Sequence, residues 1–198
     1  MPVLRLLVAV FSFVVIAAAA AAQTQGGWGL PQLMATLARV KSASAQFVER
    51  KTLHVLEAPL VSSGTLLYVA PDQVEKITVL PERERIAISG DRLTIEGGTS
   101  VRPRTLSLAN APEIAGFVEG IRATLAGDLP ALDRFYHVEL AGEPASWRLD
   151  LAPRAEKLAQ LVRRIRISGS GDRITAVETD EADGDRSEMN IAEDVHER

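Results

Sequence analysis

The stretch Val61–Ile95, VSSGTLLYVAPDQVEKITVLPERERIAISGDRLTI, predicts a β-meander that the rest of the chain must cover. Proline or short polar turns separate four runs typical of strands: Ser63–Val69, Val74–Leu80, Ile86–Ile88 and Leu93–Ile95. Gly90 followed by Asp91 is typical of a two-residue hairpin, because glycine readily adopts the positive φ of a primed turn. The isoleucines and leucine of the last two runs alternate with polar residues. One sheet face is therefore apolar, and it is either buried or holds something apolar.

Before the meander, the sequence predicts a helix and then a long strand. Apolar residues at helical spacing run from Leu30 to Val40, with Pro31 near the start of the stripe. Ser42–Lys51 then changes to a period of two, with Ala43, Ala45 and Phe47 on one face.

After the meander, the sequence predicts a strand at Val101–Leu108, in an edge or irregular position because Pro103 cannot complete a central ladder. A helix follows and ends at Gly127, and Asn110 with Glu113 has the spacing of a capping box. Five more strands are expected around Tyr136–Leu140, Trp147–Leu151, Ile165–Ile167, Ile174–Val177 and Met189–Ile191. The whole pattern predicts a mainly β (α+β) fold with two substantial helices and roughly nine to eleven antiparallel strands.

The N-terminal residues have the features of a signal peptide. Met1–Arg5 is weakly positive, Leu6–Ala22 is continuously apolar, and small residues precede Gln23. A membrane anchor is the alternative, but the apolar run is at the lower limit for spanning and no basic cluster follows it. We expect cleavage after residue 22 and a single domain over residues 23–198.

The composition of the chain limits the kinds of molecule that the protein can bind and indicates the cellular compartment in which it works. The chain has 22 Lys and Arg against 26 Asp and Glu, so its net charge of −4 disfavours nucleic acid and anionic lipid surfaces as partners. It has no cysteine, so it forms no disulfide and cannot be lipidated on an N-terminal cysteine. These features predict a soluble, non-lipidated protein of the periplasm.

Catalytic and metal-binding patterns are weak. His54, His137 and His196 lack the spacing of a metal site, and surface or rim positions explain them. The acidic run Asp180–Asp185 lacks the full calcium-loop spacing, so a solvated hairpin turn is the better interpretation. Arg164 and Arg166 alternate with isoleucines and are expected to point outward. No enzyme activity, cofactor or metal is predicted.

The order of elements resembles the LolA-type periplasmic lipoprotein carriers over nearly the whole exported chain. The matching pieces include Gly64-Thr65-Leu66-Leu67-Tyr68, the strand Pro71–Lys76, the Gly90-Asp91 hairpin and Trp147–Pro153. The segment Phe117–Leu132 is more similar to a divergent branch of that family, whose members accompany exporters and lipid-modifying enzymes. The resemblance implies an unclosed, strongly curved antiparallel β-barrel around an apolar cavity, with helices as a lid.

Two positions depart from the family pattern. Ala70 stands where the well-known carriers have an arginine that ties the lid to the sheet, and Lys76 replaces an aromatic residue. The resemblance therefore leaves the lid latch and the cargo open.

The resemblance implies a non-enzymatic, monomeric carrier that shields the acyl chains of a lipoprotein or (glyco)lipid. Its partners would be an inner-membrane transporter as donor and an outer-membrane acceptor. An envelope sensor or regulatory binding module with the same fold is the alternative. The apolar stripe Ile114, Phe117, Val118, Ile121 and Leu125 is either ordinary core or a plug that cargo displaces. The predicted cavity lining is Phe47, Leu66, Tyr68, Ile86, Ile88, Leu93, Ile95, Phe117, Ile121, Trp147 and Leu149.

Overall fold

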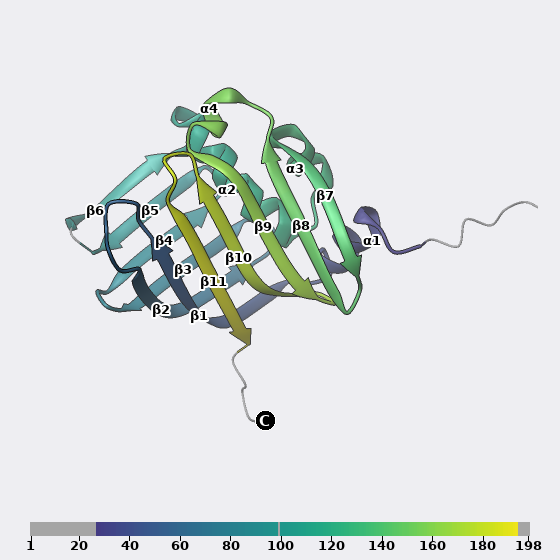
Figure 1. The fold of residues 1–198 in the computed structure, drawn as a ribbon, viewed down its shortest axis with the longest axis horizontal. Coiled ribbons are helices and arrows are strands. Elements are labelled where there is room, and N and C mark those ends of the chain that lie inside the picture. The colour runs from purple at the N-terminus through teal and green to yellow at the C-terminus, as the bar shows by residue number, and fades with distance from the viewer. Residues whose placement is uncertain (1–26, 99, 194–198) are drawn as a thin grey trace, which may run out of the picture.

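The computed structural model describes residues 27–98 and 100–193, which form one curved sheet with helices on its inner side (Figure 1). The strands are β1 (Ser42–Thr52), β2 (Leu60–Val69), β3 (Gln73–Leu80), β4 (Glu84–Ser89), β5 (Arg92–Gly97), β6 (Ser100–Ser107), β7 (Tyr136–Glu143), β8 (Ser146–Pro153), β9 (Val162–Ser170), β10 (Arg173–Glu181) and β11 (Arg186–Glu193). The helices are α1 (Leu30–Leu37), the 3₁₀ turn η1 (Leu108–Asn110), α2 (Pro112–Ala126), α3 (Leu129–Phe135) and α4 (Glu156–Ala159).

All eleven described strands belong to one antiparallel sheet. Their order is β6-β5-β4-β3-β2-β1-β11-β10-β9-β8-β7, so β6 and β7 are the two edges and the barrel is unclosed. The chain builds outward from β1 to β6, crosses the inner side through α2 and α3, and returns from β7 to β11 beside β1. The predicted unclosed, mainly β fold with helices is confirmed.

The meander Val61–Ile95 forms β2 to β5 as predicted. Gly90 has a φ of 56° and joins β4 to β5 across two residues, which confirms the hairpin turn. Pro103 lies in β6, at the margin of the sheet, where its missing N–H interrupts no central ladder.

The ends of the first two α-helices differ from the sequence predictions. α1 ends at Leu37, where the hydrogen bonding changes from the α-helical to the 3₁₀ pattern. Val40 N donates to Leu37 O at 3.0 Å, three residues back rather than four. The predicted capping box is wrong, since Asn110 belongs to η1 and Ala111 is the N-cap of α2 without a side-chain bond.

The predicted signal peptide, residues 1–22, lies outside the described residues. Among the helices that the structure describes, none combines the length and the apolar character needed to cross a membrane.

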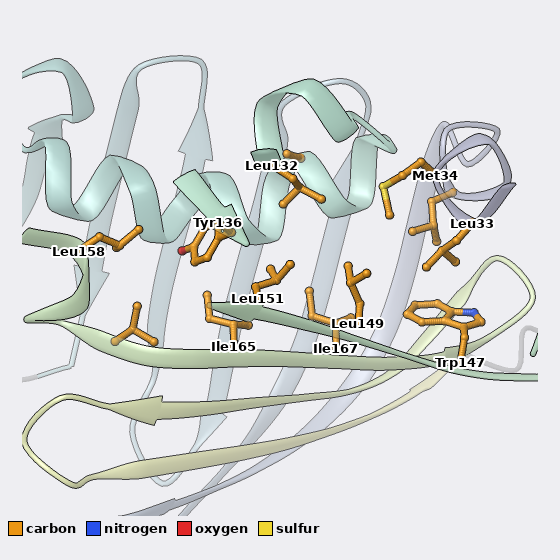
Figure 2. Packing of buried hydrophobic residues seen from close by; sticks show 13 residues of the cluster. Leu33, Met34, Leu132, Tyr136, Trp147, Leu149, Leu151, Leu158, Ile165 and Ile167 are labelled. Carbon is orange, nitrogen blue, oxygen red and sulfur yellow. The ribbon is translucent and has the colours of Figure 1, made fainter. Parts of the chain in front are cut away.

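The hydrophobic core lies between the helices and the strands β7 to β9 (Figure 2). Tyr136 is fully buried there, and its hydroxyl donates to the backbone oxygen of Gly116 at 2.9 Å. This bond ties α2 to the start of β7. The residues labelled in Figure 2 are Leu33, Met34, Leu132, Tyr136, Trp147, Leu149, Leu151, Leu158, Ile165 and Ile167.

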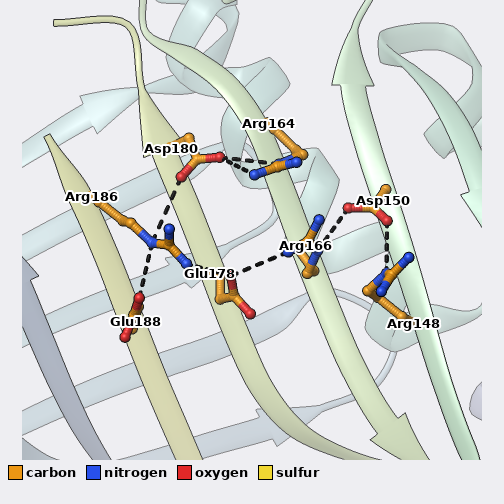
Figure 3. Close-up of polar contacts among 8 residues, drawn as sticks. All are labelled: Arg148, Asp150, Arg164, Arg166, Glu178, Asp180, Arg186 and Glu188. Carbon is orange, nitrogen blue, oxygen red and sulfur yellow. Dashed lines mark hydrogen bonds and ion pairs between the residues drawn. The ribbon is translucent and has the colours of Figure 1, made fainter. Parts of the chain in front are cut away.

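The outer face of β8 to β11 carries a ladder of opposite charges (Figure 3). Arg166 binds Asp150 at 2.9 Å, and Arg164 binds Asp180 at 2.5 Å, so both arginines point outward as predicted. The whole ladder consists of Arg148, Asp150, Arg164, Arg166, Glu178, Asp180, Arg186 and Glu188. Opposite charges on neighbouring strands favour this register and keep the outer face hydrated.

Candidate functional site

The nine predicted lining residues on strands all lie on the inner face of the sheet. Residues directly opposite in a ladder share a face, as do residues two apart in a strand. Phe47 pairs with Gly64, Tyr68 with Val74, Ile86 with Ile95, Ile88 with Leu93, and Leu149 with Ile167. These pairings place the residues on the same face of neighbouring strands across the whole sheet. On every strand involved, the side chains expected to face inward do so.

The two halves of this inner face are covered unequally. Trp147 and Leu149 are at most 2% exposed, and they lie beneath the helices in the main core. The predicted lining residues of β4 and β5, together with Leu66 on β2, are only half-buried: Leu66, Ile86, Ile88, Leu93 and Ile95. The fold therefore leaves an incompletely covered apolar surface on the β2–β5 half.

Helix α2 packs through a side of small residues and carries its bulky apolar residues on another side. Its most tightly packed side consists of small residues, and a Cβ added at Gly120 would come within 3.0 Å of the Tyr136 ring. Phe117 and Ile121 are half-buried and pack against the edge of the core. Of the predicted apolar stripe, only Val118 is buried, because the contact that seats the helix is made by glycines rather than by bulky side chains. Amphipathic spacing alone does not reveal such a small-residue contact.

A charged pair sits on the inner face beside the apolar surface. Lys76 on β3 binds the Glu49 carboxylate on β1, and the ammonium lies 5.1 Å from the centre of the Phe47 ring. Ser187 donates to the same carboxylate at 2.5 Å, and Ser62 donates at 3.4 Å. The sequence marks Lys76 only as a departure from the family pattern and gives no sign of Glu49, because the two residues are neighbours only after β1 to β3 have paired.

This pairing sets the charge state of Glu49. Burial raises the pKa of Glu49, but the Lys76 charge and the hydrogen bonds from Lys76, Ser187 and Ser62 outweigh burial. The pKa of Glu49 is therefore lowered, and its carboxylate is ionised at neutral pH.

The hydroxyl of Tyr68 has no partner among the described residues. Tyr68 is 4% exposed, and its buried oxygen makes no hydrogen bond. Burial, and then the negative charge of Asp72, raise the pKa of Tyr68, so the hydroxyl keeps its proton. Tyr68 pairs with Val74, and these are the inner-face residues of β2 and β3 nearest the turn between the two strands. The unbonded hydroxyl therefore belongs to the end of the inner face beside that turn.

A groove of about 570 Å³ opens where α2 and α3 meet the turns of the sheet. Arg122 of α2 bonds Glu119 and donates to the backbone oxygen of Gly90 in the β4–β5 turn at 3.3 Å. None of the eleven predicted lining residues borders this groove. The groove is lined by Pro71, Asp72, Gly90, Asp91, Leu108, Ala109, Ala115, Glu119, Arg122, Ala123, Ala126, Asp128, Ala131, Arg134 and Phe135.

The acidic hairpin between β10 and β11 anchors a neighbouring loop. Asp185 accepts hydrogen bonds from the backbone N and the Nδ1 of His54, at 2.9 and 2.8 Å. Glu181 binds Lys51 at 2.7 Å. Oxygens of Glu181, Asp183 and Asp185 lie within 4.8 Å of one another, but each of these carboxylates already accepts a hydrogen bond or ion pair from the protein, since Asp183 accepts from the backbone N of Asp185 at 3.0 Å. His137 is exposed, and His196 lies outside the described residues.

A family model described as "Outer membrane lipoprotein carrier protein LolA-like" matches residues 18–196. The chain belongs to this LolA-like family. The match spans all described strands and helices, so the unclosed sheet with inner helices is the LolA-like fold of this chain. No curated protein sequence matches it closely enough to add to this assignment.

Solved structures also resemble this LolA-like chain. The LolA superfamily protein NE2245 from Nitrosomonas europaea is 11% identical, with a TM-score of 0.45 over 84% of this chain and 93% of that one. A DUF1329 family protein from Desulfovibrio piger is 13% identical, with a TM-score of 0.45 over 85% and 92%. A chain of the Pseudomonas aeruginosa MucA/MucB complex is 13% identical, with a TM-score of 0.43 over 85% and 59%.

Proposed function

We propose that this protein is a periplasmic, non-enzymatic carrier that shields the acyl chains of a lipoprotein or (glyco)lipid between the inner and outer membranes. The observation that carries the proposal is the incompletely covered apolar surface on the β2–β5 half of the inner face. Membership in the LolA-like family supports it. An inner-membrane transporter would load the carrier, and an outer-membrane acceptor would receive the cargo.

The energetics of acyl burial suit this surface. Each CH₂ removed from water contributes about 0.8 kcal/mol, so a long acyl chain gains about 10 kcal/mol before ordering costs. A carrier must also release its cargo. Phe117 and Ile121 on α2 are half-buried, and movement of this helix would let these side chains and the cargo compete for the same apolar surface.

The decisive experiment compares two variants of β5. Ile95→Glu places a carboxylate on the inner face, and Thr94→Glu places it on the outer face one residue away. Each protein is purified from the envelope, checked by circular dichroism, and extracted for lipid mass spectrometry. We expect an acyl species in about equimolar amount from wild type and Thr94→Glu, and little or none from folded Ile95→Glu.

An equal lipid content in Ile95→Glu and Thr94→Glu would contradict the carrier function. Three folded but lipid-free proteins would do the same if purified protein also failed to take up an added acyl ester. The envelope-sensor function would then be the better explanation of the fold.

A further inference from the structure

We propose that Tyr68 recognises the carbonyl of an esterified or amide-linked acyl chain, and that the groove beside it holds the polar group to which that chain is attached. The inference rests on the proposed carrier function and names the chemistry of its binding site. It begins from the buried hydroxyl of Tyr68, which has no hydrogen-bond partner among residues 27–98 and 100–193.

An unpaired buried donor is unfavourable unless something supplies an acceptor. A buried polar group without a partner destabilises a protein, because it has lost its hydrogen bonds to water. Tyr136 shows the usual outcome in this same fold, because its buried hydroxyl donates to Gly116. A ligand that brings an acceptor to Tyr68 would satisfy a bond that the free protein lacks.

The surroundings of Tyr68 favour a neutral acceptor on an apolar chain. Tyr68 lies opposite Val74, which lies opposite Ile88, which in turn lies opposite Leu93. This row gives the hydroxyl an apolar approach along the inner face. A carbonyl oxygen, carried by a hydrocarbon chain that covers the row, is the simplest group that fits both requirements.

Nearby charges disfavour a free fatty acid. Asp72, four residues after Tyr68, raises the pKa of the tyrosine and would repel a carboxylate. Asp91, Glu119 and Asp128 also line the adjacent groove. Of the two arginines there, Arg122 is bonded to Glu119 and Arg134 lies over the Phe135 ring, so acidic groups outnumber basic ones at this end of the sheet. Lys76, one row deeper on the inner face, is paired with Glu49. An ester or amide carbonyl carries no net charge and escapes this repulsion.

The groove lies at the same end of the strands. The β2–β3 turn supplies Pro71 and Asp72 to its wall, and the β4–β5 turn supplies Gly90 and Asp91. Tyr68 belongs to the row of the inner face closest to these turns. An acyl chain on the inner face with its carbonyl at Tyr68 therefore directs the attached polar group into the groove.

A matched pair of ligands tests the inference. 1-Palmitoylglycerol has an ester carbonyl, and 1-O-hexadecylglycerol has an ether in its place. Delipidated protein is titrated with each, and affinity is measured by displacement of a fluorescent fatty-acyl probe. We expect wild type to bind the ester about tenfold more tightly than the ether, as one recovered hydrogen bond allows. Tyr68→Phe should bind both equally and bind the ether as wild type does.

Tyr136→Phe is the matched control, because it removes a buried hydroxyl that has a partner. We expect Tyr136→Phe to lower the melting temperature and keep the preference for the ester. Tyr68→Phe should not lower the melting temperature, since the lost hydroxyl was unbonded in the free protein.

The outcomes separate this inference from the carrier function. Equal binding of ester and ether by wild type overturns the role of Tyr68 and leaves the carrier function in place. Binding of neither ligand overturns both. A fall in melting temperature for Tyr68→Phe comparable to that of Tyr136→Phe would show that water or another partner already bonds the hydroxyl, and would also overturn the inference.

Discussion

At the scale of single residues, Glu49 and Lys76 show how the inner face tolerates charge. The side chains are 16% and 25% exposed, so both have left most of their water. Each is compensated by the other, and two serines satisfy further lone pairs of Glu49. Removing one partner of such a pair destabilises more than removing both, because it strands the other charge.

Lys76→Met tests this compensation. We expect the variant to lose about 2 kcal/mol of unfolding free energy at pH 7, because Glu49 keeps its charge without its cation. The double variant Glu49→Gln/Lys76→Met should recover at least half of that loss. Urea denaturation of the four proteins in this cycle measures the coupling. Additive losses would show that the pair contributes nothing.

Glu49 also makes the stability of the folded protein depend on pH in the acidic range. Its folded-state pKa is lowered from an ordinary value of 4.5, so its stabilising contribution is fully present above that value. The contribution is lost as the pH falls through the lower, folded-state pKa. We expect wild type to lose stability more steeply than Glu49→Gln as the pH falls below 4.5, in thermal melts at matched ionic strength. Parallel curves for the two proteins would contradict the lowered pKa.

At the scale of elements, α2 is held to the sheet from the helix side. The arginine that latches the lid in the well-known carriers is replaced by Ala70, but Arg122 on α2 reaches the Gly90 oxygen in the β4–β5 turn. The acceptor of this tether is a backbone carbonyl, which no side-chain substitution can remove. Asp91 in the same turn holds η1, because it accepts from Ser107 at 2.6 Å and from Ala109 N at 2.7 Å.

Arg122→Gln should loosen α2. Loss of one charged hydrogen bond is expected to speed amide exchange in α2 by about fivefold or more, without changing exchange in β7 to β9. Arg134→Gln is the control, since Arg134 borders the same groove but contacts only the Phe135 ring, at 5.7 Å, among the interactions described for it. Equal exchange in the two variants would mean that Arg122 does not tether the helix.

At the scale of the whole molecule, the two halves of the curved sheet differ in how their inner faces are covered. The core cluster lies on β7 to β9 and the helices, whereas the lining residues of β4 and β5 are half-buried. Local stability follows buried apolar contact, so the halves should not open with the same free energy. The less stable half is also the half that the proposed cargo would cover.

Hydrogen exchange across the whole chain tests this difference. In delipidated protein we expect the slowest amides in β8 and β9 and much faster exchange in β4 and β5. Addition of an acyl ester should slow exchange selectively in β3 to β5, because a ligand stabilises only the states that bind it. Uniform slowing over both halves, or none, would contradict binding at the β2–β5 surface.

The sequence by itself determined the strands and the apolar face. Alternation in Ile86–Ile88 and Leu93–Ile95, the Gly90-Asp91 turn and the edge position of Pro103 are local features, set by backbone sterics and by a two-residue period. They were enough to predict the sheet, whereas the resemblance to the LolA-type carriers supplied the expectation that Phe47, Leu66 and Tyr68 line one cavity.

The tertiary structure decided what covers that face. The unequal coverage of the two halves, the glycine contact of α2 with Tyr136 and the Glu49–Lys76 pair all join residues far apart in the chain. The groove also depends on turns and helices that meet only after the sheet has curved. Periodicity describes one element at a time, whereas burial and pairing depend on which elements become neighbours.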